Sequence, residues 1–281
     1  MLAGWTRIAA GACLFAGAMA VAQGDPARAF DGATAATAEG VKAVEGIRGA
    51  AVKIVLVGDS TVNSEGGWGK GFCAVLAPQV KCVNEALNGR SSKSFIDEGA
   101  WARALADQGN YYLIQFGHND QKPDAARHTD PETTYAANIR RYIRDVRAMG
   151  AVPVVVTSLS RRNYKDGKLV LDLTEYANAS KRVAAEENVT LIDLNAMSVK
   201  LLEGMTQEQA DAFDALGHAD QRAENGKAPV DRTHLNAKGQ AVFGRMVADE
   251  LIRIQVELGP DVVGAPAQGA VTTPTAESAH P

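Results

Sequence analysis

The fold is indicated first by the stretch VKIVLVGDS, which occupies residues 52–60. Its first six residues are almost all apolar, as in a strand that is buried on both faces of a parallel sheet. The pattern ends at Gly58, and Asp59 and Ser60 follow at once. Because ligands of open α/β sheets bind beyond the carboxyl ends of the strands, this order places the Ser60 hydroxyl at a binding edge.

Outward from this stretch, strand and helix patterns alternate along the chain. Short apolar runs predict parallel strands at residues 52–57, 80–83, 111–116, 152–157 and 189–193. Helical spacing of apolar residues is clearest over residues 133–149 and weaker over 175–187 and 195–204. A last helix is expected after Asn236, which is a suitable N-cap. Residues 164–169 predict a hairpin with an Asp-Gly turn.

The bulk composition is that of a globular protein. The chain has 281 residues, of which 46% are hydrophobic and 22% charged, enough for one large domain with a sizeable core. The net charge of −4 excludes the basic footprint of a nucleic-acid-binding protein, so no nucleic-acid partner is expected. The sequence does not indicate the oligomeric state.

The amino-terminal segment has the pattern of a secretory signal peptide. Arg7 precedes an apolar stretch over residues 8–21, and the small residues Ala20 and Ala22 flank Val21. We therefore predict a signal peptide at 1–22 and export to the periplasm or the medium, without stable membrane association after cleavage. The alternative, a membrane anchor, is disfavoured because the apolar run is shorter than a bilayer span.

The rest of the chain divides by composition. We predict a leader at 23–45, one domain at 46–258 and a disordered tail rich in Pro and Ala at 259–281. Cys13 leaves with the signal peptide, so Cys73 and Cys82 remain. An exported chain can pair them, but two buried free thiols fit the sequence equally well, since sequence does not give the Cβ geometry.

A second chemical signal lies late in the chain, in Asp231-Arg232-Thr233-His234. A serine hydroxyl such as that of Ser60 needs an adjacent base to become a nucleophile. An Asp three residues before a His can hold one ring nitrogen while the other nitrogen faces the serine. A capping Asp followed by a surface His is the simpler structural alternative. His128 and His218 have no carboxylate at a comparable spacing.

Two further segments offer hydrogen-bond donors for an oxyanion. Asn119 lies in QFGHND, residues 115–120, directly after the third predicted strand, and its amide can donate. Gly89 follows the second strand, and its missing Cβ lets a ligand approach the backbone N–H. The N–H of Ser60 is the third candidate. In isolation, Asn119 and Gly89 are also explained as turn residues.

Taken in chain order, these segments resemble the GDSL/SGNH hydrolases. Four blocks match: GDS at 58–60, Gly89, GHND at 117–120 and Asp231-x-x-His234. Residues 50–256 are most similar to the rhamnogalacturonan acetylesterase branch, through GDSTV at 58–62, GWG at 67–69, GRSSKSF at 89–95 and THLN at 233–236. The resemblance implies a flavodoxin-like α/β fold: a three-layer α/β/α sandwich with a central five-stranded parallel sheet.

The resemblance also implies a site and a reaction. Ser60 would be the nucleophile, His234 the base and Asp231 its orienting acid, with the Ser60 N–H, the Gly89 N–H and the Asn119 side chain as oxyanion donors. No cofactor and no metal would be needed. The substrate would be an acetylated carbohydrate, with a rhamnogalacturonan or pectin-like polysaccharide favoured. The exact polysaccharide and acetyl position stay open, because loops vary within the branch.

Three alternatives compete with this interpretation. A metal hydrolase would use the Asp and His residues as ligands, but it would leave Ser60 idle. A non-catalytic carbohydrate-binding module would need aromatic platforms, and aromatic residues make up only 6% of the chain. A lipase or thioesterase of the same superfamily would need a wide apolar groove, whereas the residues around the blocks are polar.

Overall fold

The computed structural model describes residues 52–217 and 230–254. The predicted signal peptide, leader and tail lie outside these residues, as does His218, and those predictions remain predictions. Within the described part of the chain, no helix is long and apolar enough to cross a membrane.

The core of the fold is a parallel sheet of five strands in the order β2-β1-β3-β4-β7. The strands are β1 (Lys53–Gly58), β2 (Lys81–Asn84), β3 (Tyr111–Gln115), β4 (Val152–Val156) and β7 (Thr190–Ile192). All five predicted strands are confirmed within two residues at each end. The strand order is flavodoxin-like, and it reverses between β1 and β3, where such folds bind ligands.

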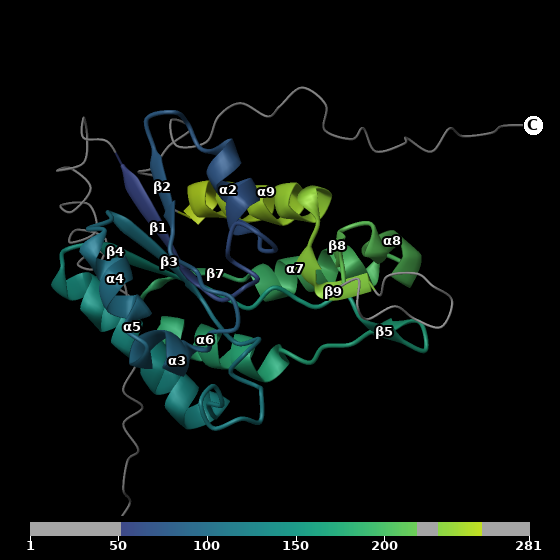
Figure 1. The fold of residues 1–281 in the computed structure, drawn as a ribbon, viewed down its shortest axis with the longest axis horizontal. Helices are drawn as coiled ribbons and strands as arrows, with labels where there is room; N and C mark the ends of the chain where they lie inside the picture. The colour runs from purple at the N-terminus through teal and green to yellow at the C-terminus, as the bar shows by residue number, and fades with distance from the viewer. Residues whose placement is uncertain (1–51, 218–229, 255–281) are drawn as a thin grey trace, which may run out of the picture. The chain divides into compact units, whose positions relative to one another are not determined.

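Helices cover both faces of the sheet (Figure 1). One face packs against α2 (Gly69–Val75), α7 (Leu194–Glu203) and α9 (Ala237–Ile254). The other packs against α3 (Ser92–Asp97), α4 (Ala100–Ala106), α5 (Ala136–Ala148) and α6 (Thr174–Glu186). The predicted three-layer α/β/α sandwich is therefore confirmed.

Burial on both faces explains why β1 is apolar after its first residue, Lys53. Ile54 and Leu56 pack with Phe243 of α9 in one core, whereas Val55 and Val57 pack in the other core with α4 and α5. Side chains alternate between faces along a strand, so a strand covered on both sides has no position for an exposed polar residue.

The helix predictions are confirmed for α6, α7 and α9, and Asn236 caps α9 by accepting a hydrogen bond from Gly239 N at 3.0 Å. The helix expected over 133–149 is α5, but it begins at Ala136. A π-helical turn (Pro131–Tyr135) precedes it, capped by the Asp130 carboxylate. Helices α2, α3, α4 and α8 (Gln207–Asp211) are too short to show a clear apolar period, which is why the pattern did not reveal them.

Two antiparallel strand pairs lie outside the main sheet in the part of the chain that the structure describes. The predicted hairpin is confirmed as β5 (Tyr164–Lys165) and β6 (Lys168–Leu169), and Asp166 and Gly167 have positive φ in its turn. The other pairs β8 (Asp214–Leu216) with β9 (Val230–Leu235) in antiparallel fashion. Asp231 and His234 therefore lie on a strand.

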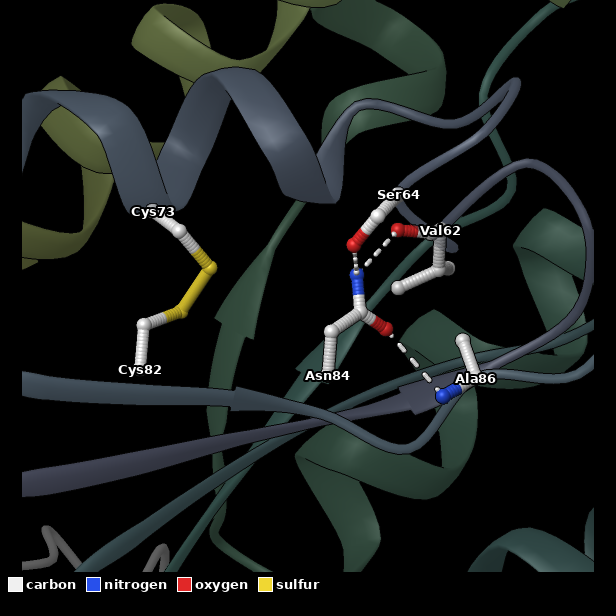
Figure 2. The surroundings of a disulfide bond; sticks show 6 residues. All are labelled: Val62, Ser64, Cys73, Cys82, Asn84 and Ala86. Carbon is white, nitrogen blue, oxygen red and sulfur yellow. Dashed lines mark hydrogen bonds between the residues drawn. A yellow bond between two sulfur atoms is a disulfide. The ribbon is translucent and has the colours of Figure 1, made fainter.

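A disulfide joins Cys73 of α2 to Cys82 of β2, with the two Cα atoms 5.6 Å apart. This decides between the two alternatives that the sequence left open. Figure 2 shows that Asn84, on the same strand, donates to Val62 O at 3.0 Å and to the Ser64 hydroxyl at 3.3 Å. Strand β2 is thus tied to α2 by a covalent bond and to the loop after β1 by hydrogen bonds.

Candidate active site

Ser60 lies just beyond the carboxyl end of β1, at the start of a tight turn. The Asp59 carbonyl accepts hydrogen bonds from the N–H groups of Val62 and Asn63 at 3.1 and 3.2 Å, which close that turn. A Cβ on Gly58 would lie 2.5 Å from the carbonyl oxygen of Gln115 and 2.6 Å from a Val62 methyl. Only glycine fits at the end of this strand, and Asp59 and Ser60 follow it.

The structure brings Ser60, His234 and Asp231 into one hydrogen-bonded chain. Ser60 Oγ lies 2.8 Å from His234 Nε2, and His234 Nδ1 lies 2.6 Å from Asp231 Oδ2. The other carboxylate oxygen of Asp231 accepts from the backbone N–H groups of Thr233 and His234 at 3.0 and 3.1 Å. Residues 174 positions apart therefore meet at the edge of the sheet.

The ionisation state of Asp231 determines which atoms donate in the hydrogen bonds that link Ser60, His234 and Asp231. Burial acts to raise the pKa of Asp231, but hydrogen bonds from the ring and backbone of His234 and the backbone of Thr233 outweigh it, and the pKa falls well below its ordinary value. An ionised carboxylate only accepts hydrogen bonds. His234 Nδ1 therefore donates, and in a neutral ring Nε2 then carries the lone pair that faces Ser60.

Gly89 and Asn119 line the same cleft as Ser60. Gly89 has a φ of +76°, and a Cβ there would meet nothing within 4 Å, so glycine is required by the backbone conformation and not by space. Asn119 Nδ2 donates to Arg90 O at 3.2 Å. The amide nitrogen has a second N–H, which leaves a donor for a ligand.

The cleft at Ser60 has a volume of about 720 Å³. Every residue that lines it is polar, charged or glycine. They are Ser60, Glu65, Gly66, Asn88, Gly89, His118, Asn119, Gln121, Lys122, Arg161, Asn163, Asp172, Thr233 and His234. Such a lining suits a hydrophilic ligand that can use many hydrogen bonds.

A network of buried hydrogen bonds holds the turn that carries Ser60. Asp59 Oδ1 accepts from the N–H and hydroxyl of Thr61 at 2.8 and 2.7 Å, and Gln115 Nε2 donates to the same hydroxyl at 2.7 Å. Trp68 Nε1 donates to Gln115 Oε1 at 2.8 Å, which connects the network to the core. Because Asp59 is fully buried, desolvation raises its pKa to about 6.

His118 faces Asp59 but does not form an ion pair with it. Its Nδ1 lies 3.7 Å from Asp59 Oδ2. Burial, followed by the positive charges of Arg161 and Arg162, lowers the pKa of His118 well below its ordinary value, so the ring is neutral. Asp120, next to Asn119, accepts from the Ser92 hydroxyl and other donors and so fixes this loop.

Sequence reasoning missed two arginines that follow β4. Arg161 lines the cleft. Arg162 is fully buried, donates to His234 O at 3.0 Å and forms an ion pair with Asp214 on β8. Both lie directly after a predicted strand, as Ser60 and Asn119 do, so their position at the sheet edge was the available signal. Over residues 52–217 and 230–254, no group of three or more His, Cys, Asp and Glu side chains is arranged to hold a metal ion.

Comparison with known proteins gives consistent similarities. Residues 56–242 match the model of the GDSL-like Lipase/Acylhydrolase family. A probable rhamnogalacturonan acetylesterase YesY from Bacillus subtilis (strain 168) is 32% identical over 219 residues, covering 75% of this chain and 97% of its own. The rhamnogalacturonan acetylesterase RhgT from the same organism is 33% identical over 223 residues, covering 75% and 94%.

Among solved structures, Axe2, an acetylxylan esterase from Geobacillus stearothermophilus, superposes with a TM-score of 0.52 at 18% identity, covering 75% of this chain and 95% of its own. That likeness bears on the fold alone. The family match covers most of the chain, including the segments that carry Ser60, Gly89, Asn119 and His234. The chain thus belongs to the GDSL-like lipase/acylhydrolase family, in its rhamnogalacturonan acetylesterase-like branch, and is a carboxylic ester hydrolase.

Proposed function

We propose that this protein is an exported serine esterase that removes O-acetyl groups from a plant-type polysaccharide or oligosaccharide, with a rhamnogalacturonan or pectin-like polymer as the favoured substrate. The observation that carries the proposal is the hydrogen-bonded chain Ser60–His234–Asp231, which opens into a cleft lined by polar, charged and glycine residues. The names of the relatives support an acetylesterase.

In the first half of the proposed reaction, Ser60 Oγ attacks the acetyl carbonyl carbon while His234 Nε2 takes the hydroxyl proton. Asp231 stabilises the imidazolium that forms. The negative charge that develops on the carbonyl oxygen is met by the N–H groups of Ser60 and Gly89 and by the Asn119 amide. The imidazolium then gives its proton to the sugar oxygen as the C–O bond of the ester breaks.

The second half returns the enzyme to its starting state. A water molecule attacks the acetyl group on Ser60 while His234 takes a proton from the water. The same donors hold the second oxyanion, acetate leaves, and the proton returns to Ser60 Oγ. One ester and one water are consumed, and one sugar hydroxyl and one acetic acid are released.

The cleft lining favours an acetyl sugar over a long acyl chain. A lipase or thioesterase would bury an alkyl chain against apolar side chains, at about 0.8 kcal/mol per methylene. No aliphatic or phenyl side chain is among the residues that line this cleft, whereas their amides, hydroxyls and charged groups can replace the water bound to sugar hydroxyls. Most binding energy is therefore expected from the sugar, because an acetyl group offers one methyl.

Export is part of the proposal and rests on the sequence pattern at residues 1–22. The disulfide between Cys73 and Cys82 supports it, since such bonds persist in oxidising compartments. Expression of the full chain in a host that recognises the signal tests this directly. We expect the mature protein in the periplasm or medium to begin at Gln23, and retention of residues 1–22 on a membrane would contradict it.

The proposed activity is tested by acetate release. Purified protein is given acetylated rhamnogalacturonan, acetylated xylan and esters of long fatty acids, with and without a metal chelator. We expect acetate from the acetylated polysaccharides, the most from rhamnogalacturonan, and negligible cleavage of the long-chain esters. Preferential cleavage of long-chain esters would favour the lipase alternative. Loss of activity with chelator and recovery with a divalent metal would favour a metal hydrolase.

A further inference from the structure

The cleft carries charges of opposite sign on its two sides. Glu65, in the loop after β1, accepts a hydrogen bond from Asn88 of the loop after β2 at 3.0 Å, which places it on the β2 side. Lys122 follows β3, and Arg161 and Asp172 follow β4. In the strand order β2-β1-β3-β4, the basic side chains therefore lie on the opposite side of the cleft from Glu65.

Arg161 is held rigidly at this basic side. Its side chain is only 10% exposed, and it donates through Nη1 to Asp172 Oδ2 at 2.6 Å and through Nε to the Thr233 hydroxyl at 3.3 Å. Among the described residues, its Nη2 has no hydrogen-bond acceptor. A guanidinium has five N–H donors, so three remain, and their direction is already fixed. Little side-chain entropy is then lost when an acceptor binds.

Lys122 adds a charge that no residue in the described part of the chain balances in an ion pair. Its backbone N–H donates to Asn119 O at 3.1 Å, which anchors the residue close to a proposed oxyanion donor. Its side chain is exposed and forms no ion pair with any described residue. Asp172 offsets the charge of Arg161, so Lys122 leaves this side of the cleft with a net positive charge.

We propose that Arg161 and Lys122 bind the carboxylate of a uronic acid unit in the acetylated substrate, and that this pair selects acidic over neutral saccharides. The inference rests on the proposed function. Arg suits the role because its planar fork matches a carboxylate, and Lys contributes a mobile point charge. Glu65 would repel a carboxylate on the β2 side, so the uronic acid unit would lie on the β3–β4 side of Ser60.

The test uses two substrates that differ in whether their carboxyl groups carry a charge. One is an acetylated oligosaccharide that contains uronic acid, and the other is the same compound with its carboxyl groups methyl-esterified. The readout is the ratio of kcat/KM for the acid to kcat/KM for the methyl ester, measured by acetate release. A ratio within one protein cancels any loss of activity that is common to both substrates.

We expect the wild-type ratio to be about tenfold or more, since a hydrogen bond to a charged group contributes about 1.5–3 kcal/mol. Lys122→Met and Arg161→Gln should bring the ratio toward one, and Glu65→Gln should raise it. Lys70→Met, an equal charge change at an exposed position on α2, is the matched control and should keep the wild-type ratio. The contribution of exposed Lys122 should also decrease with added salt.

The outcomes separate this inference from the proposed function. If both substrates release acetate but the wild-type ratio is near one, the carboxylate site is wrong and the esterase stands. If Lys122→Met and Arg161→Gln keep the wild-type ratio of kcat/KM values, the carboxylate site is likewise wrong and the esterase stands. If neither substrate, nor any acetylated sugar, releases acetate, the proposed function fails and the carboxylate site fails with it. Should Arg161→Gln not fold, Lys122→Met, at an exposed position, decides alone.

Discussion

At the scale of single residues, the ionised carboxylate of Asp231 determines how its neighbours are hydrogen-bonded. Three hydrogen bonds converge on it, from the ring and backbone of His234 and the backbone of Thr233, and they lower its pKa against the opposing effect of burial. The result fixes the ring so that Nε2 faces Ser60 Oγ at 2.8 Å. The local Asp-x-x-His spacing on β9 thus orients the His234 ring toward a serine that lies 174 residues away, as the proposed role of a base requires.

Replacing Ser60 with Ala tests the nucleophile. We expect acetate release to fall on the order of 10³-fold or more, because members of a triad act as a unit. The fold should survive, since only one oxygen is lost and the buried network behind the turn uses other side chains. The melting temperature of the same sample is the control. A folded variant that keeps a tenth of the activity would remove Ser60 from this role.

Asn119→Ala tests the oxyanion donor. We expect kcat to fall on the order of 10²–10³-fold with a smaller change in KM, because the hydrogen bond strengthens as charge develops. Asn119→Asp keeps the shape but cannot donate when ionised, so it should be as damaging. A raised KM with kcat near wild type would instead make Asn119 a sugar ligand. A lowered melting temperature alone would make it a turn residue.

The sequence allowed the central part of the site to be predicted, but not its surroundings. Ser60 and Asn119 could be found because each follows an apolar strand, and His234 because its orienting Asp is only three residues away. Arg161, Arg162 and Lys122 also follow predicted strands, but no partner residue at a short, fixed spacing marked them. Arg162 contacts the His234 carbonyl, 72 residues distant, and a contact of that kind depends on how β8 and β9 pair.

At the scale of elements, the β8–β9 hairpin carries Asp231 and His234 but lies outside the main sheet. Buried Arg162 connects it to the loop after β4, since it donates to Ser160 O and His234 O and pairs with Asp214 of β8. Burial raises the pKa of Asp214 to about 6, although the charge of Arg162 acts to lower it. The stability of the β8–β9 hairpin therefore depends on the buried ion pair between Arg162 and Asp214.

Arg162→Met should destabilise the protein by about 3–5 kcal/mol, because it leaves the Asp214 carboxylate buried and unpaired. The loss should be larger at pH 8 than at pH 5, where Asp214 is mostly protonated and needs no cation. Adding Asp214→Asn should recover part of the loss, so that the double variant is more stable than Arg162→Met. Denaturant unfolding at both pH values measures this. A loss that is independent of pH and unaffected by Asp214→Asn would contradict the role of the ion pair.

The disulfide acts at the same scale, because it fastens α2 to β2 at Cys82, which pairs with Ile54 of β1. The two cysteines are nine residues apart, and closing so short a loop restricts the unfolded chain by about 2–3 kcal/mol. We expect Cys73→Ser with Cys82→Ser to lower the free energy of unfolding by about this amount, measured against the oxidised wild type. Addition of reductant should destabilise the wild type and leave the double variant unchanged.

At the scale of the whole molecule, the strands and the long helices could be predicted from the sequence, whereas the strand order and the short helices could not be derived from the apolar pattern. Five buried strands could be located because parallel strands are continuously apolar, and α5, α6 and α9 because they lay one apolar face on the sheet. Strand order does not follow from apolar pattern and came instead from the family resemblance. Short helices such as α3 are held by caps and tertiary contacts, Ser91 in this case, so they leave little trace in the periodicity.

The stability of the whole molecule should also depend on pH through its buried carboxyl groups. Burial raises the pKa of Asp59 from 3.8 to about 6. The folded state therefore binds this proton more tightly than the unfolded state does, and stability falls as pH rises from about 4 to about 6. The difference of about two pKa values corresponds to a cost on the order of 2–3 kcal/mol above pH 7.

Asp59→Asn removes that cost while keeping the hydrogen bonds from Thr61, because the amide oxygen can replace Oδ1. Its nitrogen would take the place of Oδ2, 3.7 Å from Nδ1 of the neutral His118 ring, toward which it can donate. We expect the variant to be more stable than wild type at pH 8, with the difference shrinking as pH falls toward 4. Denaturant unfolding across this range measures the difference, with Asp97→Asn, on an exposed side chain, as the matched control. A difference that stays constant with pH would mean that Asp59 is held by its hydrogen bonds in one protonation state throughout, and that desolvation does not govern its titration.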